Sequence, residues 1–297
     1  MGGASYETVN GVLLVDKPPG PSSNAVLQRT KRLLGAARAG HTGTLDPLAS
    51  GLLVVAMGEA TKFSGAMLDA DKAYRARVKL GERTATGDAE GAVLARTQEI
   101  PARGDLLEVL DRFRGEIDQV PPAHSAIKHL GRPLYAYARK GISVPRSPRR
   151  IAIRRLELES LEGDTAVLRV ECSKGTYIRT LAEDIGDALG CGAHVAALER
   201  TAVGRFRLEQ AIALQALEAL SPAARRGRLL RPETLVGDRP RVTIGTEAAA
   251  RFRQGQTVAV DHPGGCVAVF DQEGSFLGAG EIDASGALRP KRLMAQR

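Results

Sequence analysis

Short apolar runs, each bounded by glycine, proline or small polar residues, divide this chain into segments of strand and helix length. The runs GVLLVD at 11–16 and GLLVVAM at 51–57 are nearly free of polar residues, as expected of strands that are covered on both faces. Residues 74–80, 151–158 and 166–172 alternate apolar and polar side chains, which predicts half-buried strands, and the last two could pair.

Apolar residues at helical spacing predict helices elsewhere. The clearest covers residues 24–34, where Ser22 or Ser23 can cap the first turn and Gly35 can end the last. Further helices are predicted at 106–114, 133–140, 176–189, 193–201 and 214–220. The segment 36–50 is rich in Gly, Pro and Thr, so we expect a loop there.

The character of the chain changes near residue 221. Residues 221–241 carry three prolines and several arginines, which predicts a linker. Four short strands are predicted after it, at 241–244, 257–260, 266–270 and 276–282, with one helix at 246–254. We therefore expect two domains, a mixed domain at 1–235 and a small β-rich domain at 240–297. The order of elements in the first favours an α+β fold over a doubly wound parallel sheet.

Composition then restricts the class of protein. The chain has 297 residues, 43% of them hydrophobic and 26% charged, which is ordinary for a globular protein. No apolar run approaches the roughly 20 residues that span a bilayer. Residues 1–10 lack the pattern of a signal peptide, and the three cysteines are widely spaced, so we expect a cytoplasmic location with reduced thiols. Neither the cysteines nor the five histidines form a metal-binding motif, so no metal site is expected.

Charge gives the first indication of a partner. The 42 Lys and Arg residues exceed the 34 Asp and Glu residues, and a net charge of +8 favours a polyanion such as nucleic acid. Seven basic residues and no acidic residue lie within 139–155. Among them, Arg146, Arg149 and Arg150 are candidates for contacts to an RNA backbone.

One loop combines the features of a catalytic segment. The sequence GHTGTLDPLASG at 40–51 places Asp46 before Pro47, which restricts the backbone of Asp46 to extended conformations. An apolar strand follows at once. On these residues alone, Asp46 either projects from a rigid element as a reactive carboxylate or only initiates an Asp-Pro turn.

The longer stretch GHTGTLDPLASGLL closely resembles the signature of the TruB family of tRNA pseudouridine synthases. Six more blocks resemble family motifs in the family's order. They are KPPGPSS at 17–23, DKAYRARVKLG at 71–81, TGDAEG at 86–91, QVPPAHSAIKHLGRPLYAYARKG at 119–141, CSKGTYIRTLAEDIG at 172–186 and ALERTAVGRF at 197–206. The first departs slightly, because the family often has Thr-Ser where this chain has Ser-Ser. Residues 240–297 resemble the PUA-type RNA-binding domain, mainly by position and composition.

The resemblance implies a pseudouridine-synthase fold, in which helices flank a mixed, largely antiparallel sheet. It also implies isomerisation of uridine 55 to pseudouridine in the TΨC loop of tRNA. The N1–C1′ bond breaks, the flipped base turns, a C5–C1′ bond forms and the C5 proton leaves. The exchange is redox-neutral, so neither cofactor nor metal is expected. By its place in the motif, Asp46 is the catalytic residue, as nucleophile or as base.

Further roles are implied by matching positions one by one. Tyr74 would stack on the target uracil and is a candidate for proton removal. Arg179 would pair with Asp46, and Tyr177 would lie near that pair. Leu198 would form an apolar wall of the uracil pocket, and His41 would insert into the RNA loop. Asp88, in TGDAEG, is expected to form a turn and is given no catalytic role. Whether Asp46 attacks C6 of the base, attacks C1′ of the sugar or removes a sugar proton stays open.

The expected partner is the T stem-loop of tRNA, with no membrane and no obligate protein partner, and the expected state is a monomer. Three other functions compete with this one. The chain could be a guide-directed pseudouridine synthase subunit of the dyskerin type, or a tRNA-folding factor with a vestigial site. A glycosidase is disfavoured, because that chemistry normally needs two positioned carboxylates and only Asp46 has a convincing setting.

Overall fold

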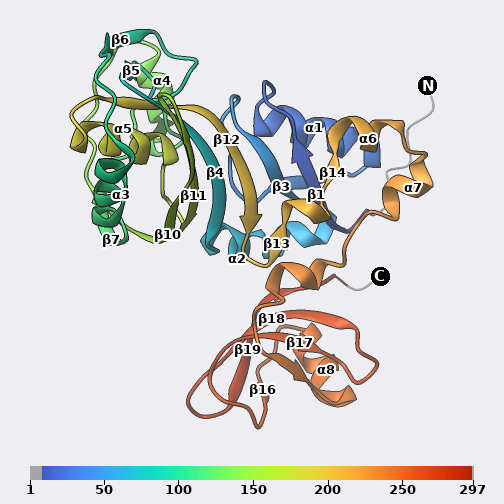
Figure 1. The fold of residues 1–297 in the computed structure, drawn as a ribbon. Coiled ribbons are helices and arrows are strands. Elements are labelled where there is room, and N and C mark those ends of the chain that lie inside the picture. Colours follow the sequence, from blue (N-terminus) through green and yellow to red (C-terminus); the bar gives the residue numbers. More distant parts are fainter. Residues whose placement is uncertain (1–8, 296–297) are drawn as a thin grey trace. The chain divides into compact units, whose positions relative to one another are not determined.

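The structure is a computed structural model that describes residues 9–295. The expected absence of a signal peptide concerns residues 1–10, which therefore lie mostly outside the described residues. The chain forms two compact units (Figure 1). One contains the residues up to Leu45, Leu53–Asp69 and Glu209 onward, and the other contains Asp46–Leu52 and Ala70–Leu208.

The first unit begins with strand β1 (Gly11–Lys17) and helix α1 (Ser23–Leu34), both close to their predicted bounds. Ser22 caps α1, since its side chain accepts a hydrogen bond from the backbone N–H of Ala25. Gly35 ends the helix with a φ of 64°, in the left-handed region that glycine adopts most easily. The apolar face of α1 is buried in one cluster with residues of β1 and β3.

Strands of this unit follow the order β14 (Ile212–Ala213), β1 and β3 (Ser50–Met57), with β1 and β14 parallel. The predicted loop at 36–50 was only partly correct, because strand β2 (Ala39–His41) pairs antiparallel with β3. Such a short strand carries no periodicity of its own. It forms because β3 presents an edge for pairing.

The second unit contains strands β12 (Ala193–Val203), β4 (Lys72–Leu80), β11 (Thr165–Cys172), β10 (Arg149–Glu162) and β7 (Gly115–Gln119), in that order. All pairs along this order are antiparallel, whereas β12 runs parallel to the first residues of β3. Helix α5 (Ile178–Ala188) contacts β12, and helix α3 (Arg103–Arg112) contacts β10. The mixed, largely antiparallel sheet with flanking helices is confirmed.

The helix predicted at 193–201 was wrong. This segment is strand β12, which pairs with β4 on one side and with β3 on the other. Its Ala, Leu and Glu residues are good helix formers, but pairing with two strands at the centre of a sheet outweighs that preference. His194 and Arg200 are both buried on this strand, so its polar residues were no guide to solvent exposure.

The linker predicted at 221–241 was also wrong in part. The segment contains helix α7 (Pro222–Arg226) and the short 3₁₀ helix η3 (Pro232–Val236). Both begin with proline, which suits the first helical position as well as it suits a loop. Between them, Leu230 exchanges two backbone hydrogen bonds with Val12, of 2.8 and 2.9 Å.

The C-terminal residues form a separate five-stranded sheet with its own apolar core. The strands are, in spatial order, β15 (Arg241–Thr243), β17 (Gly265–Phe270), β18 (Phe276–Ile282), β19 (Ala287–Leu293) and β16 (Val258–Ala259). Helix α8 (Thr246–Arg253) packs beside them, as predicted. Strand β19 was not predicted, because Pro290 interrupts its pattern.

The remaining described elements are short. They are η1 (Gly58–Phe63), α2 (Ser64–Asp69), β5 (Glu82–Thr84), β6 (Val93–Arg96), β8 (Lys128–His129), β9 (Arg132–Pro133), α4 (Leu134–Ala138), β13 (Phe206–Arg207), η2 (Leu208–Gln210) and α6 (Leu214–Ala219). No helix among residues 9–295 is long and apolar enough to cross a bilayer.

Candidate active site

The loop that carries Asp46 is fixed on both sides of that residue. Before it, the Ser23 hydroxyl donates to the carbonyl of Leu45 over 2.9 Å and accepts from the N–H of Leu45 over 2.7 Å. After it, the N–H of Ala49 donates to the carbonyl of Asp46 over 3.1 Å. Pro47 limits the backbone further. The Asp46 carboxylate is therefore presented from a defined backbone, which is what a reactive group needs.

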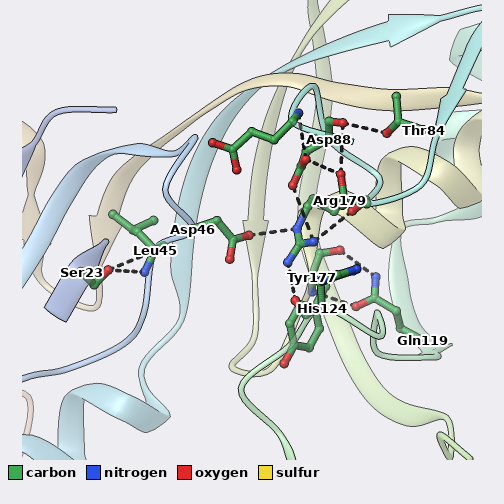
Figure 2. Close-up of polar contacts among 11 residues, drawn as sticks. Ser23, Leu45, Asp46, Thr84, Asp88, Gln119, His124, Tyr177 and Arg179 are labelled. Carbon is green, nitrogen blue, oxygen red and sulfur yellow. Dashed lines mark hydrogen bonds and ion pairs between the residues drawn. The ribbon is translucent and has the colours of Figure 1, made fainter. Parts of the chain in front are cut away.

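The side chain of Asp46 meets Arg179, the second residue of helix α5. Arg179 Nε lies 2.9 Å from Asp46 Oδ2 (Figure 2). The arginine side chain is 6% exposed, whereas the carboxylate is 38% exposed. The pair leaves one side of Asp46 open to solvent and to a substrate. The predicted contact between these two residues is present in the structure.

The Arg179 guanidinium has two more hydrogen-bond acceptors and one more ion-pair partner. It donates to the carbonyl of Thr86 over 3.0 Å and to the carbonyl of His124 over 2.8 Å. Its Nη1 lies 3.6 Å from Oδ2 of Asp88, whose side chain is as buried as its own. Most of the donors of a guanidinium are thereby used, so its plane is fixed.

Asp88 has two functions in this arrangement. Its Oδ1 accepts from the Thr86 hydroxyl over 2.5 Å and from the N–H of Glu90 over 3.1 Å, which closes the turn that was predicted. Its Oδ2 faces Arg179. The sequence prediction identified the turn and missed the ion pair. An acidic residue in a block that matches the family was the only available signal.

Tyr177 precedes helix α5 and has an extended backbone, with φ −106° and ψ 110°. Both backbone polar groups of Tyr177 are bound by the side chain of Gln119, which donates to the Tyr177 carbonyl over 3.1 Å and accepts from the Tyr177 N–H over 2.8 Å. Burial raises the pKa of the Tyr177 phenol, and the Asp46 charge acts in the same direction. Tyr177 therefore stays neutral over a wider pH range than a free tyrosine.

Tyr74 lies on β4 opposite Arg200 of β12. Its hydroxyl is hydrogen-bonded to Arg200, whose side chain is among the largest fully buried ones and also donates to the carbonyl of Leu52 over 2.8 Å. Burial raises the pKa of the Tyr74 phenol, and the Asp46 charge raises it further. Leu198 lies two residues before Arg200 on the same strand, so the two side chains share a face of the sheet. Leu198 is 8% exposed.

The remaining predicted residues are arranged as follows. His41 lies on β2 in the other unit, paired with Val55. Arg146 donates to the carbonyl of Pro121 over 2.9 Å. Arg150 lies 3.4 Å from both Glu116 and Asp118 of the neighbouring strand. Part of the positive charge of residues 139–155 is therefore balanced, because β7 brings two carboxylates beside Arg150.

Comparison with known proteins identifies the family. The family model for the N-terminal domain of TruB pseudouridylate synthases matches residues 31–178, and two C-terminal TruB models match 179–232 and 240–294. A tRNA pseudouridine synthase B from Thiobacillus denitrificans is 55% identical over 292 residues, which cover 97% of both chains. The chain belongs to the TruB family. A second TruB relative, a tRNA pseudouridine synthase B from an Azoarcus species, is 56% identical over 97% of this chain and 95% of its own.

Solved structures show the same relationship at lower identity. A Cbf5-Nop10-Gar1 complex contains a chain that matches with a TM-score of 0.76 and 28% identity, over 98% of this chain and 87% of its own. A chain in an H/ACA RNP bound to a substrate RNA containing 2′-deoxyuridine matches with a TM-score of 0.74 and 27% identity, over 97% and 86%. These agreements confirm the TruB-type fold and the C-terminal β-rich part.

The structure brings the predicted residues Asp46, Arg179, Tyr177 and Tyr74 together in one compact unit. Sequence reasoning missed Gln119 and Arg200, which bind Tyr177 and Tyr74. Both are polar residues 2% exposed to solvent. A glutamine that ends a strand and an arginine in a mixed run give no periodic signal of burial. Among residues 9–295, no three His, Cys, Asp or Glu side chains are grouped to hold a metal ion.

Proposed function

We propose that this TruB-family protein isomerises uridine 55 of tRNA to pseudouridine, with Asp46 as its catalytic carboxylate. The observation that carries the proposal is the ion pair between Asp46 and Arg179, in which only the carboxylate has substantial exposed surface. The ion pair holds the carboxylate in one direction, and the other hydrogen bonds of Arg179 fix the guanidinium from which that direction is set. An ionised, oriented carboxylate can act as nucleophile or base.

The tyrosines supply the rest of the proposed pocket. Tyr74 would stack on the flipped uracil, with its hydroxyl fixed by Arg200. Leu198, on the strand beside it, would exclude water from the base. Tyr177 would face the same carboxylate from the residue before helix α5. His41 would replace a stacking partner that the RNA loop loses when the uridine leaves it, which offsets a few kcal/mol of unstacking.

The proposed substrate contact extends beyond the reacting base. Arg146, Arg149 and Arg150 would meet phosphates of the T stem, and residues 240–297 would form a second RNA-binding domain after the catalytic domain at 1–235. We also propose that the protein acts in the cytoplasm as a monomer, without an obligate protein partner. Its 55% identity to a relative named tRNA pseudouridine synthase B, against 28% to a chain of a Cbf5-Nop10-Gar1 complex, supports that choice.

The test is tritium release from a tRNA transcript that carries [5-³H]uridine, without added metal or cofactor. Purified wild type should release tritium, and Asp46→Asn should release none while binding tRNA as before. Asp238→Asn is the matched control, because Asp238 is exposed and lies outside the site. Release by Asp46→Asn at the wild-type rate would remove Asp46 from the chemistry. No release by wild type, despite tRNA binding, would favour the guide-directed or folding-factor function.

A further inference from the structure

Gln119 is a buried amide at the end of strand β7, and its side chain binds both backbone polar groups of one residue, Tyr177. It is 2% exposed. Its Nε2 donates to the carbonyl of Tyr177 over 3.1 Å, and its Oε1 accepts from the N–H of Tyr177 over 2.8 Å (Figure 2). A side chain that satisfies both polar groups of one residue fixes the position and the orientation of that residue.

The residue that Gln119 binds is the one from which helix α5 starts. Tyr177 has an extended backbone, so its N–H points away from the helix and needs a partner outside it. Its carbonyl accepts the first helical bond, from Leu181 over 3.0 Å, in addition to the amide of Gln119. Arg179 follows two residues later. A displacement of Tyr177 would therefore move the guanidinium that contacts Asp46.

The loop that follows Gln119 contacts the side chain of Arg179 directly. Five residues after Gln119, the carbonyl of His124 accepts from Arg179 over 2.8 Å. Gln119 thus fixes the backbone that carries Arg179, and the loop after it supplies an acceptor for the side chain of Arg179. Both contacts depend on where β7 ends, and β7 is itself paired with β10 through Gln119 and Arg149.

We propose that Gln119 is a positioning residue for the isomerisation, acting through the backbone of Tyr177 on Arg179 and hence on Asp46. This rests on the proposed function of the Asp46–Arg179 pair. The requirement is for one donor and one acceptor at fixed places, rather than for polarity as such. A misplacement of about 1 Å in such a site can lower a rate about a hundredfold.

That requirement allows a test by protonation. Gln119→Glu has the same shape. When protonated, its carboxyl group has an O–H donor for the Tyr177 carbonyl and an oxygen acceptor for the Tyr177 N–H. When ionised, it has no donor and places negative charge beside a carbonyl oxygen. Burial raises the pKa of such a carboxyl group, so we expect it to lose its proton within the pH range over which the rate can be measured. Gln119→Met retains the approximate length and loses both hydrogen bonds at every pH.

The experiment measures single-turnover tritium release at saturating tRNA from about pH 6 to about pH 9, as a ratio to wild type at each pH. The ratio cancels the effects of the charged and titratable groups that all variants share near Gln119. These are Tyr177, Arg179 on α5, Arg149 on β10, Glu116 and Asp118 on β7, and His124. We expect Gln119→Met to be slower by about tenfold to a hundredfold throughout. We expect Gln119→Glu to be equally slow at about pH 9 and to recover to within about threefold at about pH 6.

Binding, folding and a matched variant complete the design. The tRNA dissociation constants of both variants should stay near that of wild type, and circular dichroism should show a folded protein. Gln98→Glu, an exposed glutamine in the same unit, should match wild type at every pH. Wild-type rates in Gln119→Met would overturn the proposal. So would a pH-independent ratio for a folded Gln119→Glu. If wild type releases tritium and Asp46→Asn does not, such a result counts against Gln119 alone and leaves the proposed function intact.

Discussion

Arg179 lies between two carboxylates of very different exposure. Its Nε contacts Asp46, 38% exposed, over 2.9 Å, and its Nη1 lies 3.6 Å from Asp88, 6% exposed. The buried carboxylate balances the arginine charge inside the protein, which leaves the exposed carboxylate available to a substrate. The arrangement explains how one buried arginine can orient Asp46 while a second carboxylate offsets the arginine charge.

Asp88→Asn should slow the reaction without unfolding the protein. The amide keeps an acceptor for Thr86 and Glu90, so the turn survives, but it loses the charge beside Arg179. We expect the single-turnover rate of tritium release to fall about tenfold or more, with little change in tRNA affinity. Asp164→Asn, which changes an aspartate paired with Lys79 away from the site, is the control. Equal rates for Asp88→Asn and wild type would show that the Asp88 charge is not needed.

Arg179→Lys should be more severe. Lysine keeps the charge but cannot contact Asp46 and the carbonyls of Thr86 and His124 with one planar group. We expect a loss of about a hundredfold in single-turnover rate. Arg83→Lys provides the comparison, because Arg83 forms an exposed pair with Asp187 that should contribute little. A rate for Arg179→Lys close to wild type would mean that charge alone suffices.

Much of this architecture is visible in the sequence, for reasons that particular elements illustrate. Strand β3 is a continuous apolar run, helix α1 has an apolar face at helical spacing, and both have clear end signals, so their bounds were predicted to within a residue or so. Strand β12 was predicted as a helix, because its structure depends on two partners distant in the chain. The same holds in the site. Asp46 stands in a distinctive local motif, whereas Gln119 acquires its role only through contact with Tyr177, 58 residues away.

The basic run gives a prediction about salt. Replacing Arg146, Arg149 and Arg150 by Gln should weaken tRNA binding and flatten its dependence on salt, with a slope change of about 0.9 for each phosphate that is no longer neutralised. Among single changes, Arg149→Gln should cost more than Arg150→Gln, because Glu116 and Asp118 already face Arg150. Filter binding over a salt series measures both effects, with the exposed Arg103→Gln as control. Parallel salt curves for the triple variant and wild type would exclude phosphate binding by these arginines.

Tyr74 predicts a loss of stability in alkali. Burial raises the pKa of its phenol in the folded protein, although Arg200 opposes the shift. In the unfolded chain the phenol loses its proton near pH 10, so above that pH the unfolded state binds fewer protons and stability falls. Below about pH 10 the phenol is protonated in both the folded and the unfolded state, so its contribution to the free energy of unfolding is fully present. Urea unfolding from about pH 8 to about pH 11 should show a shallower decline for Tyr74→Phe than for wild type.

The control for this measurement is Tyr135→Phe, since Tyr135 is 41% exposed. That variant should follow the wild-type curve. If the free energy of unfolding of Tyr74→Phe falls with pH as steeply as that of wild type, the loss of stability in alkali arises from groups other than the Tyr74 phenol.

Gly51 marks the closest approach of β3 to β12. Its φ is +97°, and a Cβ atom there would lie 2.4 Å from the carbonyl oxygen of Arg200 and 2.7 Å from its nitrogen. Gly51→Ala should therefore lower the free energy of unfolding by about 2–4 kcal/mol, because the backbone of β12 must move. Gly104→Ala in helix α3, where no atom lies within 4 Å of the added carbon, should be neutral or slightly stabilising. Urea unfolding of both variants measures the difference. If Gly51→Ala were as stable as wild type, the backbone of β12 would have to lie further from Gly51 than 2.4–2.7 Å allows.

The pairing of β3 with β12 also sets an order of events during synthesis. The bond from Arg200 to Leu52 joins residues 148 positions apart, and β12 lies between β3 and β4. Until residues 193–203 leave the ribosome, strand β3, which follows the loop with Asp46, lacks β12 as its neighbour, and β4 lacks β12 too. Closing such distant pairs is slow, and unpaired apolar edges invite wrong pairings in the interval. Maturation of the site thus waits for the synthesis of more than two thirds of the chain, so a ribosome that stalls before β12 would release a polypeptide carrying Asp46 on an unfinished sheet.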